Sequence, residues 1–235
     1  MVNRFRLEFA FDICVRYLTD YKMNNSDIEK RKHMKNQEKT ELTVAKITAA
    51  AMDEFGSSGY AGGTINNICK TGINKGLIYH NFKDKDELYL FCLKKSCEKL
   101  CDYLENGKKL DDPADYMKLR IRFFDANPNE AHIFFEALLC PPVALQGRIQ
   151  DEMQRFNKIN DTVCRNALAK LSLRDGISNE DALSYVRQLQ VMFNGYFSSP
   201  ACRDISIAEK ARRHEESMSK LLDFMLYGIA KKGKD

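Results

Sequence analysis

The sequence predicts an all-α fold, with a small three-helix head near the N-terminus and a larger helical body behind it. Only 5 prolines and 12 glycines interrupt the 235 residues, which leaves room for long helices. From residue 43 onward, apolar residues recur at the three- and four-residue spacing of amphipathic helices. Apolar residues make up 44% of the chain and charged residues 30%, so the composition is that of a globular protein with a buried core.

Residues 1–38 differ from the rest and are interpreted as an N-terminal extension. Between Phe5 and Tyr17, apolar residues alternate with mostly polar ones, which is the period of a strand. This segment could pair across a dimer, could be helical despite its pattern, or could result from an upstream start codon, because Met23 and Met34 are later starts. Its polar end carries a basic cluster of Lys30, Arg31, Lys32 and Lys35. A disordered linker or a basic arm for a DNA minor groove would both fit that cluster.

The first helix of the head is predicted from one apolar stripe that begins just after Thr43. The stripe consists of Val44, Ile47, Ala51 and Phe55. Gly56 and Gly59 predict the end of this helix. Thr64 then suits the N-cap of a short second helix, whose inward residues are Ile65 and Ile68.

Residues 64–82 are interpreted as two short helices joined by a turn. Gly72 lies where the chain needs a residue that tolerates positive φ, and Asn74 suits the N-cap of the next helix. Helices too short to bury a core of their own are typical of a helix-turn-helix that binds DNA. Between residues 64 and 85 there are four lysines and one aspartate, a local charge of +3. Such a face can neutralise phosphates, although a solvated helix face is the alternative.

The remaining helices are predicted from their caps and breakers. Asp84 and Glu87 match a capping box that opens a long helix ending near Gly107. The further helices are expected at about 113–125, 128–140, 143–172, 178–198 and 205–231.

Several classes of site are not supported by the sequence. The eight cysteines lack the spacing of a small secreted scaffold and indicate reduced thiols in the cytoplasm. The four histidines show no metal-ligand spacing, so neither a metal nor a cofactor is predicted. No nucleophile elbow, phosphate loop or paired catalytic carboxylates are present, so the chain is not predicted to be an enzyme. No run of eighteen apolar residues exists, so no membrane partner is expected.

A long ordered motif runs through the head: Glu54-Phe55-Gly56, Gly59-Tyr60, Thr64-Ile65, Ile68 and the continuous run from Asn74 to Leu88. With this motif, residues 40 to 90 resemble the DNA-binding head of the tetracycline-repressor (TetR) family. The resemblance implies a homodimeric, ligand-responsive transcription regulator, usually a repressor, that binds a palindromic operator and is released by a small-molecule inducer. It also implies a DNA-binding domain at residues 39–86 and a helical ligand-binding and dimerisation domain at residues 87–235.

The resemblance also implies roles for individual residues of the head. The implied DNA-binding residues are Thr64, Asn74, Lys75, Gly76, Leu77, Tyr79, His80, Lys83 and Lys85. The positions implied to pack inward are Ile65, Ile68, Ile78 and Phe82. One departure is a spacing between Ile68 and Gly72 that is one residue shorter than in most members, which predicts an early end to the second helix or a tighter turn.

The body is expected to hold an effector whose identity the sequence does not give. The candidate ligand-binding residues are Phe124, Phe135, Met153, Phe156, Asn157, Met192, Phe193 and Tyr196. The aromatic content, with Glu136 and Glu152 nearby, suggests a lipophilic or cationic compound. The last two helices are expected to form the dimer interface as an intermolecular four-helix bundle. Two alternatives stay open: a helical dimeric adaptor that has lost DNA binding, and a thiol-based redox sensor.

Overall fold

The computed structural model describes residues 38–107 and 112–229, within which every element is helical and no strand occurs. The all-α prediction is thereby confirmed. The chain forms two compact units, residues 1–46 and 47–235. In the first unit the described residues, 38–46, are helical. The predictions for the segment from Phe5 to Tyr17 and for the basic cluster at 30–35 lie outside the described residues. The predicted domain divisions after residues 38 and 86 stay predictions.

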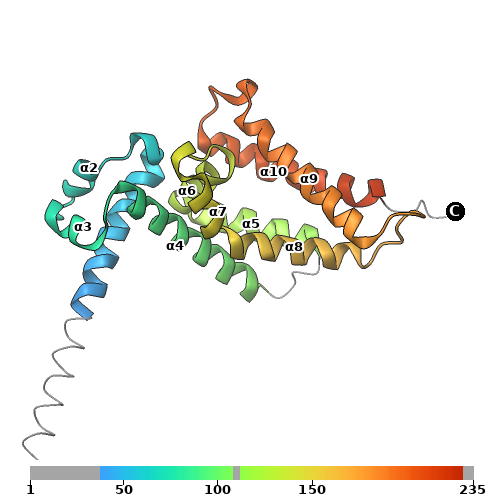
Figure 1. The fold of residues 1–235 in the computed structure, drawn as a ribbon, viewed down its shortest axis with the longest axis horizontal. Helices are drawn as coiled ribbons and strands as arrows, with labels where there is room; N and C mark the ends of the chain where they lie inside the picture. Colours follow the sequence, from blue (N-terminus) through green and yellow to red (C-terminus); the bar gives the residue numbers. More distant parts are fainter. Residues whose placement is uncertain (1–37, 108–111, 230–235) are drawn as a thin grey trace, which may run out of the picture. The chain divides into compact units, whose positions relative to one another are not determined.

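The second unit opens with a helix over residues 47–62, and a series of further helices follows it (Figure 1). These are α2 (Ile65–Cys69), α3 (Lys75–Asn81), α4 (Lys85–Asn106), α5 (Pro113–Ala126), α6 (Pro128–Leu139), α7 (Gln146–Glu152), α8 (Gln154–Leu168), α9 (Asn179–Ser198) and α10 (Ile207–Ile229). Short 3-10 turns, η1 (Val143–Leu145) and η2 (Pro200–Cys202), precede α7 and follow α9.

The single helix expected at about 143–172 is instead divided into η1, α7 and α8. The break between α7 and α8 lies at Met153, whose ψ of −1° interrupts the regular helical backbone. The Met153 N–H still donates to the Ile149 carbonyl at 3.1 Å, so the chain bends without losing this hydrogen bond. Ile149 from α7 and Phe156 from α8 are both buried on either side of the bend. A bend without proline or glycine leaves no signal in the sequence.

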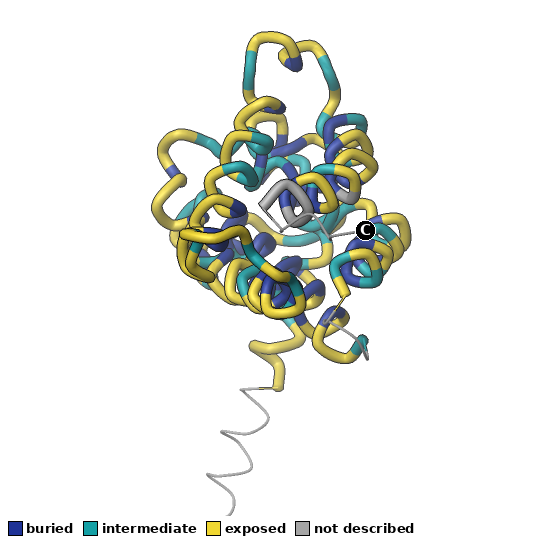
Figure 2. The backbone as a smooth tube through the Cα atoms, turned by 90° about the vertical axis from the view of Figure 1, so that its right-hand side faces the viewer, coloured by how far each residue is buried: buried dark blue, intermediate teal, exposed yellow. Residues whose placement is uncertain are grey.

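The core of the body is built around α6, which contacts α4, α5, α9 and α10. Its residues Ile133, Phe134 and Phe135 are fully buried. The Phe124 ring lies 4.7 Å from that of Phe135, and Phe134 lies 4.9 Å from Phe156, measured between ring centroids. Burial of aromatic rings is the main source of stability in such a cluster. Buried and exposed segments alternate along the helices, as expected for amphipathic elements (Figure 2).

The helix over residues 47–62 changes course at Gly59, which has a φ of +68°. The next N–H, that of Tyr60, donates to both carboxylate oxygens of Glu136 in α6, at 2.9 and 3.0 Å. The buried Tyr89 hydroxyl of α4 donates to the same carboxylate at 2.9 Å. One side chain therefore joins the end of the first helix, α4 and α6. Hydrogen bonds to an ionised group are among the stronger ones in proteins.

A second set of contacts ties the same turn to the start of α4. The Tyr60 hydroxyl donates to Asp86 at 2.6 Å, and this hydrogen bond raises the pKa of Tyr60 to about 12. The Lys85 ammonium lies 4.5 Å from the centre of the Tyr60 ring and donates to the Gly63 carbonyl at 3.0 Å. The Tyr60 side chain thus contacts the start of α4 through its hydroxyl and its ring, while the Tyr60 N–H contacts α6.

We expect Gly59→Ala to destabilise the protein more than Gly72→Ala. Both glycines have positive φ, so alanine costs about 1–2 kcal/mol at either position. A Cβ at Gly59 would lie 2.6 Å from Glu136 Oε1, whereas one at Gly72 meets nothing within 4 Å. Displacing Glu136 should cost roughly 1–3 kcal/mol more. Urea unfolding of the two variants measures the difference, and equal losses of stability would contradict it.

Candidate functional site: a helix-turn-helix face and two cavities

The turn between α2 and α3 shows how the short spacing before Gly72 is accommodated. Each of the three residues after Cys69 donates its N–H to the carbonyl three residues earlier, at 3.0–3.2 Å. This tighter winding follows the end of α2 at Cys69, so both alternatives that the short spacing predicts, an early end and a tighter turn, occur together. Gly72 then adopts a φ of +94°, which reverses the chain toward α3 at no steric cost for a glycine.

Both predicted N-caps are present. Thr64 Oγ1 accepts from the Asn67 N–H at 3.1 Å, and Asn74 Oδ1 accepts from the Gly76 N–H at 2.7 Å. These bonds satisfy N–H groups that have no partner within their own helices. The side-chain oxygen of Asn74 is therefore engaged in starting α3, which leaves its side-chain amide nitrogen for other contacts.

The predicted DNA-binding residues lie together on and beside α3. The exposed members are Thr64, Asn74, Lys75, Gly76, Leu77, Tyr79, His80 and Lys83. Lys85 is half-buried against Tyr60. The residues predicted to pack inward are all buried: Ile65, Ile68, Ile78 and Phe82. This division places the polar and basic side chains on one face and the anchoring apolar side chains on the other.

Two large side chains of α3 are exposed without an apparent structural reason. Leu77 is 41% and Tyr79 48% exposed. Lys75 donates to Asn66 of α2 at 3.1 Å, which ties the two helices of the motif together. Lys70 is also exposed at the end of α2 and belongs to the same basic face, although it was not among the predicted contact residues. Exposed apolar groups beside lysines are typical of a surface that binds a partner.

The body contains an apolar cavity of about 590 Å³ lined by α5, α6, α10 and the helix over residues 47–62. Phe124 and Phe135 form its aromatic wall. Its ionisable lining residues are Asp125, His132, Arg212, Glu215 and Glu216. The volume is within the usual range for small-molecule sites, roughly 300–1,000 Å³.

A second, polar cavity of about 330 Å³ lies among α5, α6, α8, α9 and α10. Phe156, Asn157 and Asn194 line it, together with Arg120 and His214. The Arg120 guanidinium lies 5.2 Å from the centre of the Phe156 ring. This cavity therefore combines a cation, an aromatic ring and amide groups.

A buried ion pair lies between these two cavities. Arg120 Nη2 donates to Glu215 Oε1 at 2.6 Å, and both side chains are less than a tenth exposed. His214 Nδ1 lies 3.0 Å from the same oxygen, and its Nε2 lies 2.9 Å from Asn194 Oδ1. Burial lowers the pKa of His214. Among the described residues, Arg120 Nε and Glu215 Oε2 are buried without hydrogen-bond partners, which is unusual for charged groups.

Sequence reasoning missed Arg120, His214 and Glu215. Arg120 and Glu215 are 95 residues apart in the chain, so no local spacing relates them. One signal was available: Arg120 follows the buried Met117 and precedes the buried Phe123 at helical spacing, so a charge interrupts an apolar stripe.

The residues predicted to bind a ligand do not form a single site. Phe124 and Phe135 line the apolar cavity, and Phe156 and Asn157 line the polar one. The others lie elsewhere: Met153 is buried outside both cavities, Phe193 packs its ring on His214, and Met192 and Tyr196 are exposed on α9. Glu136, which suggested a cationic ligand, is instead bound to Tyr60 and Tyr89.

The described residues contain neither a metal-binding cluster nor a membrane-spanning helix. Across residues 38–107 and 112–229, no three histidine, cysteine or acidic side chains are grouped closely enough to hold a metal ion. None of the helices in those same ranges has both the length and the apolar character needed to cross a bilayer.

Comparisons with known proteins agree with this architecture. The family model for "Bacterial regulatory proteins, tetR family" matches residues 47–91, and that for "Tetracyclin repressor-like, C-terminal domain" matches residues 114–233. No curated protein sequence matches the chain.

Solved structures of similar fold include a tetR-family transcription regulator from Shewanella sp. PV-4, at 19% identity and a TM-score of 0.53. The match covers 81% of this chain and 99% of the Shewanella chain. FadR from Bacillus subtilis, in complex with stearoyl-CoA, has 15% identity and a TM-score of 0.53. The match covers 79% of this chain and 98% of the FadR chain. A tetR-family regulatory protein from Rhodococcus RHA1 has 17% identity and a TM-score of 0.51, over 80% of this chain and 98% of the Rhodococcus chain. Because the C-terminal family match alone spans more than half of the 235 residues, this chain belongs to the tetR family of bacterial transcription regulators.

Proposed function

We propose that this chain is a homodimeric transcription repressor in the cytoplasm, which binds a palindromic DNA operator and is released by a small-molecule inducer. The observation that carries the proposal is the solvent-facing surface of α3. Lys75, Leu77, Tyr79 and His80 are exposed on this surface, while Ile78 anchors the helix from the opposite side. A helix of this kind can enter the major groove with its first residues near base edges.

The residues of this face divide into two groups by chemistry. Asn74, Gly76 and Leu77 at the start of α3 would meet base edges, with Leu77 suited to a thymine methyl group. Lysine and tyrosine side chains around them would bind phosphates and fix the register of the helix. Lys85 would contribute a phosphate contact from the start of α4 while also supporting Tyr60.

A second copy of the chain is the proposed partner for α9 and α10, which pack on each other. Apolar side chains remain exposed on both helices. They are Tyr185, Val191, Met192 and Tyr196 on α9, and Phe224 on α10. Covering this face in a two-fold dimer would bury these groups and would place two heads on successive turns of a palindromic operator.

The inducer is proposed to act through α6. Phe135 of this helix lines the apolar cavity, and the next residue, Glu136, holds Tyr60 at the end of the first helix. A ligand that displaces α6 would therefore act on the head as well. FadR from Bacillus subtilis, a relative in fold, was solved with stearoyl-CoA, which supports a small-molecule site in the body of this chain too.

The two alternatives are less well supported. A thiol-based sensor needs an accessible thiolate, and burial excludes Cys92 and Cys97 from that role by raising the pKa of each to about 12, which leaves the half-buried Cys69 and Cys140 as the candidates. An adaptor that has lost DNA binding would not need the exposed lysines and Tyr79 on α3. No catalytic activity is part of the proposal.

Lys75→Ala should weaken binding to the DNA upstream of the protein's own gene and lower the salt dependence of binding. Loss of one phosphate contact reduces the slope of log K against log salt by about 1. Lys94→Ala is the matched control, because it removes the same charge from an exposed position on α4. Titrations at several salt concentrations, by gel shift or fluorescence anisotropy, measure both slopes.

If wild-type protein binds no palindrome in that DNA in a salt-sensitive way, the repressor proposal fails and the adaptor alternative gains support. If Lys75→Ala and Lys94→Ala leave the slope equally unchanged, α3 is not the DNA-binding helix.

Met192→Asp combined with Phe224→Asp should convert the dimer to a monomer. Met192 is 70% and Phe224 81% exposed, so neither change disturbs the core of the monomer, but both would place charges inside the proposed interface. Val143→Asp, at an 84% exposed apolar position in η1, is the control and should leave the dimer intact. Sedimentation velocity distinguishes the outcomes, and a double variant that still forms dimers would exclude the α9–α10 interface.

A further inference from the structure

A cysteine and a buried lysine meet where the C-terminal end of α6 lies against the first turn of α10. Lys210 Nζ donates to Cys140 Sγ at 3.2 Å. The two helices pack against each other, and the end of α6 is also held by α9, because the Ser198 hydroxyl donates to the Leu139 carbonyl. The amine and the thiol, distant in the sequence, are therefore brought into contact by the fold.

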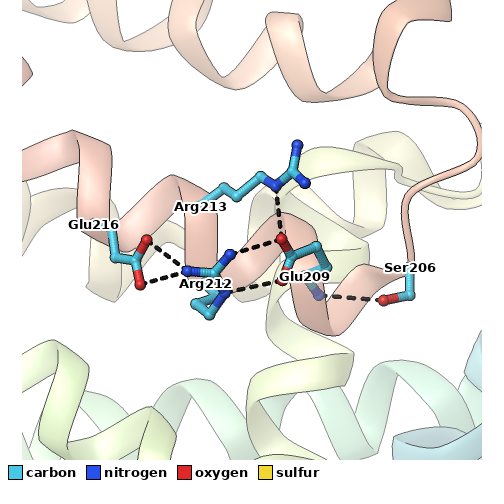
Figure 3. Close-up of polar contacts among 5 residues, drawn as sticks. All are labelled: Ser206, Glu209, Arg212, Arg213 and Glu216. Atoms are coloured by element: carbon cyan, nitrogen blue, oxygen red, sulfur yellow. Dashed lines mark hydrogen bonds and ion pairs between the residues drawn. The ribbon is translucent and has the colours of Figure 1, made fainter.

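Lys210 is buried without a carboxylate to neutralise it. Its side chain is only 5% exposed, and across residues 38–107 and 112–229 it forms no ion pair. The adjacent acid, Glu209, instead binds Arg212 and Arg213 at 2.7–2.9 Å (Figure 3). Arg212 is shared with Glu216, so this network leaves Lys210 out. Sulfur is a weak hydrogen-bond acceptor, and a buried lysine that depends on one is unusual.

Cys140 differs from the other thiols of the described residues in its surroundings. Five of them are fully buried, whereas Cys140 and Cys69 are only half-buried. Within the described ranges, no lysine or arginine donates to Cys69. A neighbouring ammonium favours the thiolate, which is the reactive form of a cysteine. Cys140 is thus the thiol that combines partial exposure with a bound amine.

We propose that Cys140 and Lys210 form a peroxide-reactive pair, in which hydrogen peroxide converts their hydrogen bond into a covalent sulfur–nitrogen (sulfenamide) bond. Only the peroxide has to enter from solvent, and it is a small molecule that meets a half-buried thiol. The oxidation is a second input beside the proposed inducer. Its effect on DNA binding rests on the proposed function.

The reaction needs no reagent besides the peroxide. The Cys140 thiolate attacks one peroxide oxygen, the O–O bond breaks, and the leaving hydroxide takes a proton from the Lys210 ammonium to form water. Sulfur is thereby oxidised to a sulfenic acid, the peroxide is reduced, and Lys210 is left as a neutral amine. The amine then attacks sulfur, the S–O bond breaks, and the departing hydroxide takes a proton from nitrogen to form a second water. Sulfenic acids condense in this way even with backbone nitrogen, which is a weaker nucleophile than an amine.

The new bond would act on the helix that contacts the head. Cys140 lies one turn after Glu136, and its N–H donates to the Glu136 carbonyl at 2.9 Å. A covalent bond is much shorter than the 3.2 Å hydrogen bond, so it would draw the end of α6 toward α10. Because the Glu136 carboxylate accepts the Tyr60 N–H, this displacement is expected to alter the attachment of the head.

Peptide mass mapping of the full chain after treatment with hydrogen peroxide at pH 7 tests the bond. We expect a peptide containing Cys140 joined to one containing Lys210, with the loss of two hydrogen atoms and with release by dithiothreitol. Cys140 should lose its free thiol about tenfold or more faster than Cys69, the half-buried control in the same digest. Oxidation of Cys140 without the joined peptide, or equal rates at the two thiols, would overturn the proposal.

Variants separate the charge of Lys210 from its nucleophilicity. Lys210→Arg keeps a cation beside the thiol but removes the amine, so the sulfenic acid should persist and be trapped at Cys140 by dimedone. Lys220→Arg, at an exposed position on the same helix, is the matched control and should form the joined peptide as the wild type does. Dimedone labelling of Lys210→Arg no greater than that of the wild type would contradict the role of the amine. Should Lys210→Arg fail to fold, Cys140→Ser decides, because a joined peptide that persists in this variant would exclude the pair.

The mapping needs no DNA, so the two proposals can fail separately. If the bond forms and operator binding in a gel shift is unchanged, the reactive pair stands and its regulatory effect is contradicted. If the bond does not form in a protein that binds its operator, the pair alone is contradicted. If the bond forms in a protein that binds no operator, the repressor proposal alone fails.

Discussion

The Glu136 carboxylate is the contact on which the attachment of the head to the body depends. It accepts the Tyr60 N–H at the kink of the first helix and the Tyr89 hydroxyl from the centre of α4. Gly59 is required beside it for two reasons, its positive φ and the absence of space for a Cβ. Because Glu136 belongs to α6, any movement of that helix alters a hydrogen bond of the DNA-binding head. A carboxylate in this position supports both the stability of the fold and the proposed signal between effector and DNA.

The Arg120–Glu215 pair is a second constraint, because it divides the interior of the body into two cavities of different chemistry. Ion pairs of this kind contribute little net stability once the cost of desolvation is counted. Arg120 belongs to the lining of the polar cavity, and Glu215 to that of the apolar cavity, so the pair separates two differently lined spaces.

Local rules were enough to predict the head, whereas the ligand site depended on contacts distant in the chain. Thr64 and Asn74 were identified as N-caps because capping depends on neighbours two or three residues away. The departure from the TetR-family spacing before Gly72 predicted either an early end to α2 or a tighter turn. The bend at Met153 left no glycine or proline to reveal it. Aromatic and sulfur-containing side chains were predicted to bind the ligand. Of these, Phe124 and Phe135 do line a cavity, but Met192 and Tyr196 are exposed. Apolar residues of a cavity wall and of a protein interface look alike in sequence, and only packing separates them.

Amide hydrogen exchange at Tyr60 tests the role of Glu136 most directly, with Glu136→Leu compared to wild type. If the head is coupled to the body through this carboxylate, the protection of the Tyr60 amide against exchange should fall about tenfold or more in the variant. The protection of the Ile78 amide inside α3 should stay unchanged. Glu130→Leu on the same helix, which breaks an ion pair with Lys99, is the control and should leave Tyr60 protected. Unchanged protection of Tyr60 in Glu136→Leu would contradict the coupling between head and body.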